Sequence, residues 1–153
     1  MDEVLSLVQD LAAYEGSPGS VAMDADLFGA ALFGPSPRVF GHVAEIDRRV
    51  LGMAIWFVTF STWTGHHGIF LEDLYVRPEA RGRGIATSLL AELAAIARRE
   101  RYLRIDWSVL DWNEPALAFY RSVGARPMDE WTGYRLDGEA LRSLGAGAPE
   151  GPA

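Results

Sequence analysis

Residues 71–86 read LEDLYVRPEARGRGIA, and this stretch decides the fold. Its first half continues a run of apolar and β-branched residues that predicts a strand over residues 69–76. Apolar spacing after Gly84 predicts a long helix over residues 85–101. The turn between them is rich in arginine and glycine. Small residues let the backbone approach a ligand closely, and free amides at a helix start bind phosphate, so the turn predicts a pyrophosphate-binding loop.

Two well-known phosphate loops fit this turn poorly. A Walker loop needs a lysine, and the chain contains none. A dinucleotide-binding loop needs glycine or alanine where this chain has Thr87, although Asp106 falls near the position of a ribose-binding acid. Asp106 lies inside an expected strand rather than at its end. The remaining pattern is R-x-x-G-x-A, formed by Arg81, Gly84 and Ala86.

A second motif, VLDWNEPALAFYRSVGA, occupies residues 109–125. Asn113 suits the N-cap of a helix predicted over residues 114–123, and Pro115 fits its first turn. Tyr120 lies seven residues after Asn113, so both project from one face of the helix. A tyrosine at this spacing is either a functional group or a core aromatic residue.

The rest of the chain predicts a mixed α/β sheet covered by helices, because strands come first and then alternate with helices. The other strands are expected at residues 39–46, 51–60 and 103–109, with weaker ones near 126–129 and 133–136. The other helices are expected at residues 4–12, 24–33 and 138–144. We expect a single domain over residues 1–144 and a disordered tail over residues 145–153.

Composition narrows the functional classes. The chain has 153 residues, no cysteine and no apolar run long enough to cross a membrane. Without cysteine there is no disulfide or thiolate nucleophile, and an acidic start without a signal-peptide pattern predicts a cytoplasmic protein. Residues 1–80 contain eleven acidic and four basic side chains and carry the whole net charge of −7. Such a field disfavours nucleic acid and favours a cationic partner. His66 and His67 lack the pattern of a third ligand, so we expect no metal.

Together the two motifs resemble those of the GNAT acetyltransferases. Four strings are similar to the diamine (spermidine/spermine) and thialysine acetyltransferase branch, and the similarity covers residues 2–144. The strings are LAAYE at residues 11–15, STWTG at 61–65, LEDLYV at 71–76 and LDWNEP at 110–115. The resemblance implies a GNAT fold with a central, mixed, mostly antiparallel twisted sheet flanked by helices. The family begins with a strand before its first helix, whereas this chain opens inside the helix. We therefore expect the first edge strand to be missing, through a truncated start or a real loss, and we expect a homodimer.

The resemblance also implies an activity, the transfer of an acetyl group from acetyl-CoA to a primary amine of a small cationic substrate. That substrate would be a polyamine, a diamine or a thialysine-like amino acid. Tyr120 would protonate the leaving thiolate or donate a hydrogen bond to it. The implied cofactor-binding residues are Leu74, Tyr75, Val76, Arg81, Gly82, Arg83, Gly84, Ile85, Ala86, Thr87, Asn113, Ala116, Tyr120 and Arg121. The implied substrate-binding residues are Tyr14, Glu15, Trp63, Glu72 and Asp73.

The amine must lose a proton before it attacks, which requires a base near the site. Glu72 is the candidate, because an apolar strand would desolvate its carboxylate and raise its pKa. In a regular strand Asp73 would point to the opposite face. The family has a bulge in this strand, however, which would bring both acids near the site and free backbone amides for the acetyl carbonyl.

Two alternatives stay open at this point. A non-catalytic regulator that binds acyl-CoA would use the same fold, although it would need neither Glu72 nor Tyr120. An acetyltransferase for another amine, such as an aminated antibiotic, would keep the same catalytic groups. Near the C-terminus the family tends to place a substrate-facing glutamate before a Gly-aromatic pair. Here Trp131 and Thr132 precede Gly133 and Tyr134, so the sequence does not identify the amine.

Overall fold

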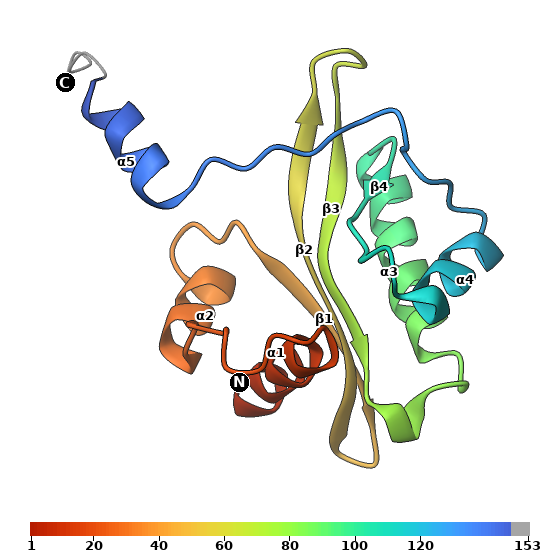
Figure 1. Cartoon of the computed structure of the whole chain (residues 1–153). Coiled ribbons are helices and arrows are strands. Elements are labelled where there is room, and N and C mark those ends of the chain that lie inside the picture. The colour runs from red at the N-terminus through yellow and green to blue at the C-terminus, as the bar shows by residue number, and fades with distance from the viewer. Residues whose placement is uncertain (148–153) are drawn as a thin grey trace. The chain divides into compact units, whose positions relative to one another are not determined.

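The structure, a computed structural model, describes residues 1–147 (Figure 1). The chain divides into two compact units, Met1–Ala118 and Phe119–Ala153, and each is described by itself. The helices are α1 (Asp2–Tyr14), α2 (Ala25–Phe33), α3 (Ile85–Glu100), α4 (Glu114–Ser122) and α5 (Gly138–Ala146), with a short 3-10 turn, η1 (Pro78–Ala80). No helix of residues 1–147 is both long and apolar enough to cross a membrane.

The first unit contains a four-stranded mixed sheet in the order β1-β2-β3-β4. The strands are β1 (Phe40–Ile46), β2 (Arg49–Ser61), β3 (His66–Val76) and β4 (Ile105–Asp106). The first three pair antiparallel, and β4 pairs parallel to β3. Figure 1 shows β2 and β3 as a long hairpin through the middle of this unit. Strand β1 lies at the sheet edge, as expected for a GNAT-like sheet that lacks its first strand.

Each face of the sheet buries its own apolar cluster. Helix α3 covers one face, where Leu93 packs with Ile69 of β3. Helices α1 and α2 cover the other face, where Leu7 and Phe28 pack against Met53 of β2 (Figure 1). Leu7, Met53, Ile69 and Leu93 have no exposed surface. Successive side chains along β2 and β3 point to opposite faces of the sheet, so a residue's position in the strand determines which of the two clusters it joins.

The sequence predicted more strand near the C-terminus than the structure contains. Residues 126–129 and 133–136, expected as weak strands, form no strand in the structure. Pro127 lacks the N–H that a sheet ladder requires, and Gly133 weakens a strand. The strand expected at 103–109 is only two residues long. Of the predicted tail, residues 145–146 end helix α5, and residues 148–153 lie outside the described part of the chain.

Candidate active site

A β-bulge in β3 brings two carboxylates together. Ile55 of β2 pairs with Asp73 and the next residue, Trp56, pairs with Leu71, so Glu72 is an extra residue without a cross-strand partner. Paired residues share a face, which places Asp73 on the face of Ile55, covered by α1. The extra residue interrupts the alternation of side chains between the two faces of the sheet. As a result, neither Glu72 nor Asp73 lies on the face covered by α3, where Leu71 is buried.

Asp73 carries the perturbed carboxyl group of this cluster. Its pKa is raised from 3.8 to about 6, mostly by burial and additionally by the negative charges of Glu72 and Glu15. Glu15 immediately follows the last residue of α1. Glu72 itself is exposed. The desolvation predicted for Glu72 is therefore wrong, since half-buried Asp73 is the less exposed of the two carboxylates at the bulge.

Beyond the bulge, β3 presents a backbone edge. Its parallel pairing with β4 is confined to Ile69 and Phe70 in the described chain, so the strands separate just before Glu72. Tyr75 and Val76 are 6% and 8% exposed, so their side chains belong to the core and only their backbone can reach a ligand. Burial also raises the pKa of Tyr75. Leu74 is half-buried against the α3 cluster.

The turn after β3 has the form of an anion-binding loop. Gly82 and Gly84 adopt positive φ angles of 72° and 79°, and a Cβ at either position would meet no atom within 4 Å. Helix α3 begins directly after Gly84, and no side chain of the described chain caps it. The amides of Ile85, Ala86 and Thr87 therefore point out of the first helical turn without helical acceptors. Arg83 is exposed between the two glycines.

The two arginines that precede this turn both contact other groups of the protein. Arg81 donates from Nε to the carbonyl of Val76 at 3.0 Å. Arg77, which follows the last residue of β3, forms an ion pair with Asp10 of α1, with Nη1 to Oδ2 at 2.7 Å. It also donates to the Ser6 hydroxyl at 3.2 Å. Arg77 thus attaches α1 to the end of β3. No residue near Arg77 in the sequence indicates this role.

Asn113 is the one buried polar residue among the described residues, at 8% exposure. Its Oδ1 accepts the backbone N–H of Ala116 at 3.3 Å, which confirms the predicted N-cap of α4. The same oxygen accepts the hydroxyl of Tyr14 at 3.0 Å. The centroid of the Tyr14 ring lies 6.0 Å from that of the Trp112 ring and 5.0 Å from the guanidinium carbon of Arg81. Sequence analysis missed this contact because 99 residues separate its partners.

Two further predicted site residues belong to the second unit, and a third lies at the tip of the β2–β3 hairpin. Tyr120 is half-buried in α4, within the second unit, with its ring 5.3 Å from that of Phe119. Arg121 follows it on the same helix and is exposed. Trp63 is 87% exposed in the turn between β2 and β3. It lies past the end of β2, about 20 Å along the strand from Ile55, so the chain does not bring Trp63 to the carboxylates of its own bulge.

Strand β3 begins with His66 and His67, the two histidines for which no metal was expected. The ring Nδ1 of His66 lies 2.6 Å from the carbonyl of Thr64, and that of His67 lies 3.1 Å from the carbonyl of Thr59. Across residues 1–147, no three His, Cys, Asp or Glu side chains gather closely enough to hold a metal ion.

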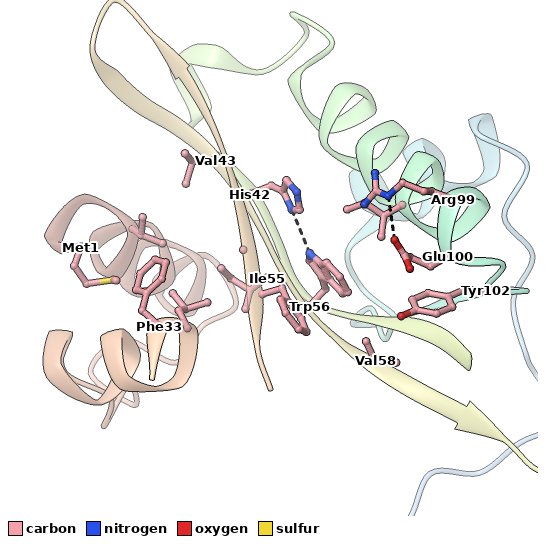
Figure 2. Close-up of a pocket in the computed structure, with 15 residues that line it drawn as sticks. Met1, Phe33, His42, Val43, Ile55, Trp56, Val58, Arg99, Glu100 and Tyr102 are labelled. Atoms are coloured by element: carbon pink, nitrogen blue, oxygen red, sulfur yellow. Dashed lines mark hydrogen bonds and ion pairs between the residues drawn. The ribbon is translucent and has the colours of Figure 1, made fainter. Parts of the chain in front are cut away.

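A separate groove of about 730 Å³ lies along the open edge of β1 (Figure 2). Phe33 of α2 and Tyr102, which follows α3, line it from different elements. Inside it, Trp56 donates from Nε1 to Nδ1 of His42 at 3.2 Å. None of the bulge carboxylates lines this groove, so it is distinct from the candidate active site.

Comparisons with known proteins bear on the family and the fold. A model of the acetyltransferase (GNAT) family matches residues 4–125. The chain is 34% identical over 152 residues to the thialysine N-epsilon-acetyltransferase of Sus scrofa, covering 92% of this chain and 89% of the relative. The chain belongs to the GNAT acetyltransferase family. Another relative, an L-ornithine N5-acetyltransferase of Arabidopsis thaliana, is 33% identical over 98 residues, 64% of this chain and 43% of that protein.

Among solved structures, an integron cassette protein from the mobile metagenome of V. cholerae superimposes with a TM-score of 0.79. It is 29% identical and covers 94% of this chain and 90% of its own. The family and its relatives identify this GNAT protein as an acetyltransferase, and the family uses acetyl-CoA as cosubstrate. The open glycine turn, the uncapped start of α3 and exposed Arg83 fit the pyrophosphate of that cosubstrate.

Proposed function

We propose that this enzyme transfers the acetyl group of acetyl-CoA to a primary amine of a small cationic substrate, such as a thialysine-like amino acid, a diamine or a polyamine. The observation that carries the proposal is the acidic group at the bulge of β3. Glu15, Glu72 and Asp73 interact closely enough for the first two to raise the pKa of the third. A substrate with an ammonium group relieves this repulsion, because its positive charge pairs with the crowded carboxylates. The relatives named for thialysine and ornithine support the same class of amine.

The residues divide the reaction into binding and proton transfer. We propose that the loop of residues 81–87 binds the pyrophosphate and that Asn113 contacts the cosubstrate further along. Backbone amides beyond the bulge, at Leu74 to Val76, would face the acetyl carbonyl and stabilise the charge that develops there. The cosubstrate supplies the acetyl group as a thioester, which makes it reactive toward a neutral amine.

Proton transfer is assigned to the carboxylate pair and to Tyr120. An alkylammonium has a pKa of about 10.4, so almost none of it is neutral at pH 7. Glu72 and Asp73 together accept its proton, with Asp73 as the member whose titration near pH 6 sets the acidic limb of the rate. The amine nitrogen then forms its bond to the acetyl carbon as the carbon–sulfur bond breaks. Over one turnover the ammonium releases two protons, and one ends on the thiol, delivered by Tyr120, while the other reaches solvent.

An acetyl-CoA turnover screen tests the substrate class. Thialysine, lysine, ornithine, spermidine, a monoamine and an arylamine should be compared at equal concentration. We expect amines with a second positive charge to react fastest, and their KM to rise with salt, because charges near a surface are screened. A faster rate with the arylamine, or with an aminoglycoside, would overturn the small-cation proposal while leaving the acetyltransferase intact.

Binding of the cosubstrate is tested separately with Arg83→Glu. Charge reversal next to the proposed pyrophosphate site should raise the Kd of acetyl-CoA at least about tenfold, because charge-assisted contacts are among the stronger hydrogen bonds. Calorimetry with acetyl-CoA alone measures this without any choice of amine. Arg38→Glu, an exposed reversal in the loop before β1, is the matched control. Equal affinities for both variants would remove the loop from the site.

We further propose that the enzyme acts as a homodimer. The open edge of β1 is a surface that proteins usually cover, because unpaired strand groups promote association. Light scattering at low protein concentration should give twice the chain mass of 16.8 kDa. A mass of one chain under conditions of full activity would show that the monomer suffices.

A further inference from the structure

We propose that Tyr14 is a positioning residue for acetyl-CoA, acting through Asn113 and Arg81, rather than a wall of the amine pocket. This inference rests on the proposed function, since it takes the loop of residues 81–87 and the start of α4 as the cosubstrate site. Resemblance alone placed Tyr14 beside the amine. The contacts of its hydroxyl and of its ring lead instead to the two segments that would bind acetyl-CoA.

The hydroxyl of Tyr14 determines how the Asn113 amide is oriented. Oδ1 of Asn113 accepts from the Tyr14 hydroxyl at 3.0 Å and from the N–H of Ala116 at 3.3 Å. A backbone N–H can only donate, so the oxygen of the amide must face these partners. The amide nitrogen, with its two N–H donors, is thereby directed to the other side. A cosubstrate rich in carbonyl and phosphate oxygens needs donors of this kind.

The ring of Tyr14 orders the second segment. The guanidinium of Arg81 lies 5.0 Å from the centroid of the Tyr14 ring and 5.7 Å from that of Tyr75, so two aromatic rings contact one cation. Nε of Arg81 is held by the carbonyl of Val76. Arg81 begins the glycine turn, and fixing its side chain limits the conformations open to the turn that follows. Trp112, which packs on the same ring, precedes Asn113 directly.

The end of α1 therefore serves both halves of the site. Glu15 acts electrostatically on Asp73 at the bulge, whereas Tyr14, the residue before it, contacts Asn113 and Arg81. Successive residues at a helix end point in different directions, so one helix terminus reaches both the proton acceptor and the cosubstrate segments. Arg77 and Asp10 hold α1 in this place through their 2.7 Å ion pair.

The test uses Tyr14→Phe, which keeps the ring and removes only the hydroxyl. We expect the Kd of acetyl-CoA, measured by calorimetry, to rise about three- to tenfold, because one hydrogen bond that orients a binding group is lost. With a reactive amine, the KM for acetyl-CoA should rise in parallel, while kcat at saturating acetyl-CoA and the KM for the amine stay within about twofold. Tyr102→Phe removes a hydroxyl from another half-buried tyrosine outside the site and should change none of these values.

A double-mutant cycle separates this proposal from the proposed function. Asn113→Ala should weaken acetyl-CoA binding by itself, and in that background Tyr14→Phe should have no further effect, because its partner is gone. Asn113→Asp keeps the acceptor oxygen for Tyr14 but replaces the N–H donors, so it should also weaken binding if the alanine variant folds poorly. If Asn113 variants weaken binding and Tyr14→Phe does not, Tyr14 has no positioning role. If Asn113 variants bind normally, the cosubstrate site itself is misplaced. If Tyr14→Phe raises only the KM for the amine, and not the Kd or KM for acetyl-CoA, Tyr14 lines the amine pocket instead.

Discussion

The bulge end and the tip of the β2–β3 hairpin differ in how far other elements of the protein cover them. Both ends contain residues that the sequence linked to amine binding, Glu72 and Asp73 at the bulge and Trp63 at the tip. At the bulge, α1 covers the face of the sheet on which half-buried Asp73 lies, and the end of α1 adds the charge of Glu15. At the tip, Trp63 is 87% exposed. The pKa of a carboxyl group is thus raised where another element of the fold covers it and brings further negative charges close to it.

The largest expected effect lies at the bulge. Asp73→Asn keeps the shape of the side chain but removes its ability to accept a proton, and kcat/KM should fall about a hundredfold or more. The fall should be greatest above pH 6, where Asp73 is ionised in the native protein. Steady-state kinetics at pH 5 to 9 measure this, with Asp26→Asn, an exposed residue of α2, as the control of equal charge. An equal fall in kcat/KM for both variants would show that Asp73 contributes no more to catalysis than an exposed surface carboxylate does.

The same substitution should stabilise the fold. The native protein favours protonated Asp73, since its pKa is raised from 3.8 to about 6, and so its ionisation opposes folding above pH 6. This cost grows between pH 3.8 and 6 and is fully present at pH 7.5. Asp73→Asn should then raise the free energy of unfolding by about 1–2 kcal/mol at pH 7.5, after allowance for partial solvation, and by nothing at pH 3.5.

Urea denaturation at both pH values measures the difference. A gain that is equal at pH 3.5 and 7.5 would show that improved packing, and not relief of a buried charge, explains it. Loss of activity together with a gain of stability is the pattern expected of a functional group held in an unfavourable environment.

Much of this site follows from local sequence, and the rest depends on long-range packing. The glycine turn and the start of α3 were predicted because their signals lie within six residues of each other. The burial of Asp73 was assigned to Glu72, because a bulge leaves no mark in the pattern of apolar residues and shifts every later side chain by one position. The ion pair of Arg77 could not be predicted, since nothing near it in the sequence indicates its partner Asp10, 67 residues away.

A smaller effect distinguishes the members of the bulge pair. The charge of Glu72 raises the pKa of Asp73, so Glu72→Gln should move the acidic limb of the pH–rate profile below its starting value near 6, by a fraction of a pH unit. Complete loss of the limb would instead identify Glu72 as the sole proton acceptor. Profiles of kcat/KM report the free enzyme, in which the structure describes both carboxylates.

The smallest effect is expected at the tip of the hairpin. Trp63→Ala removes a large side chain that lies past the end of β2, about 20 Å along the strand from the residue paired with Asp73. Within one chain, the substitution should change kcat and the KM for the amine by less than about twofold, and it should leave the pH–rate profile unaltered. The measurement should be made with the best amine of the screen, at protein concentrations above and below the dimer dissociation constant found by light scattering. A KM that rises severalfold only where dimers are present would mean that the tip of one copy reaches the bulge of another. The two ends of the hairpin would then belong to one site after all, built from two chains. A rise that persists in dilute monomers would require the tip to reach its own bulge, in conflict with the length of the strand that separates them.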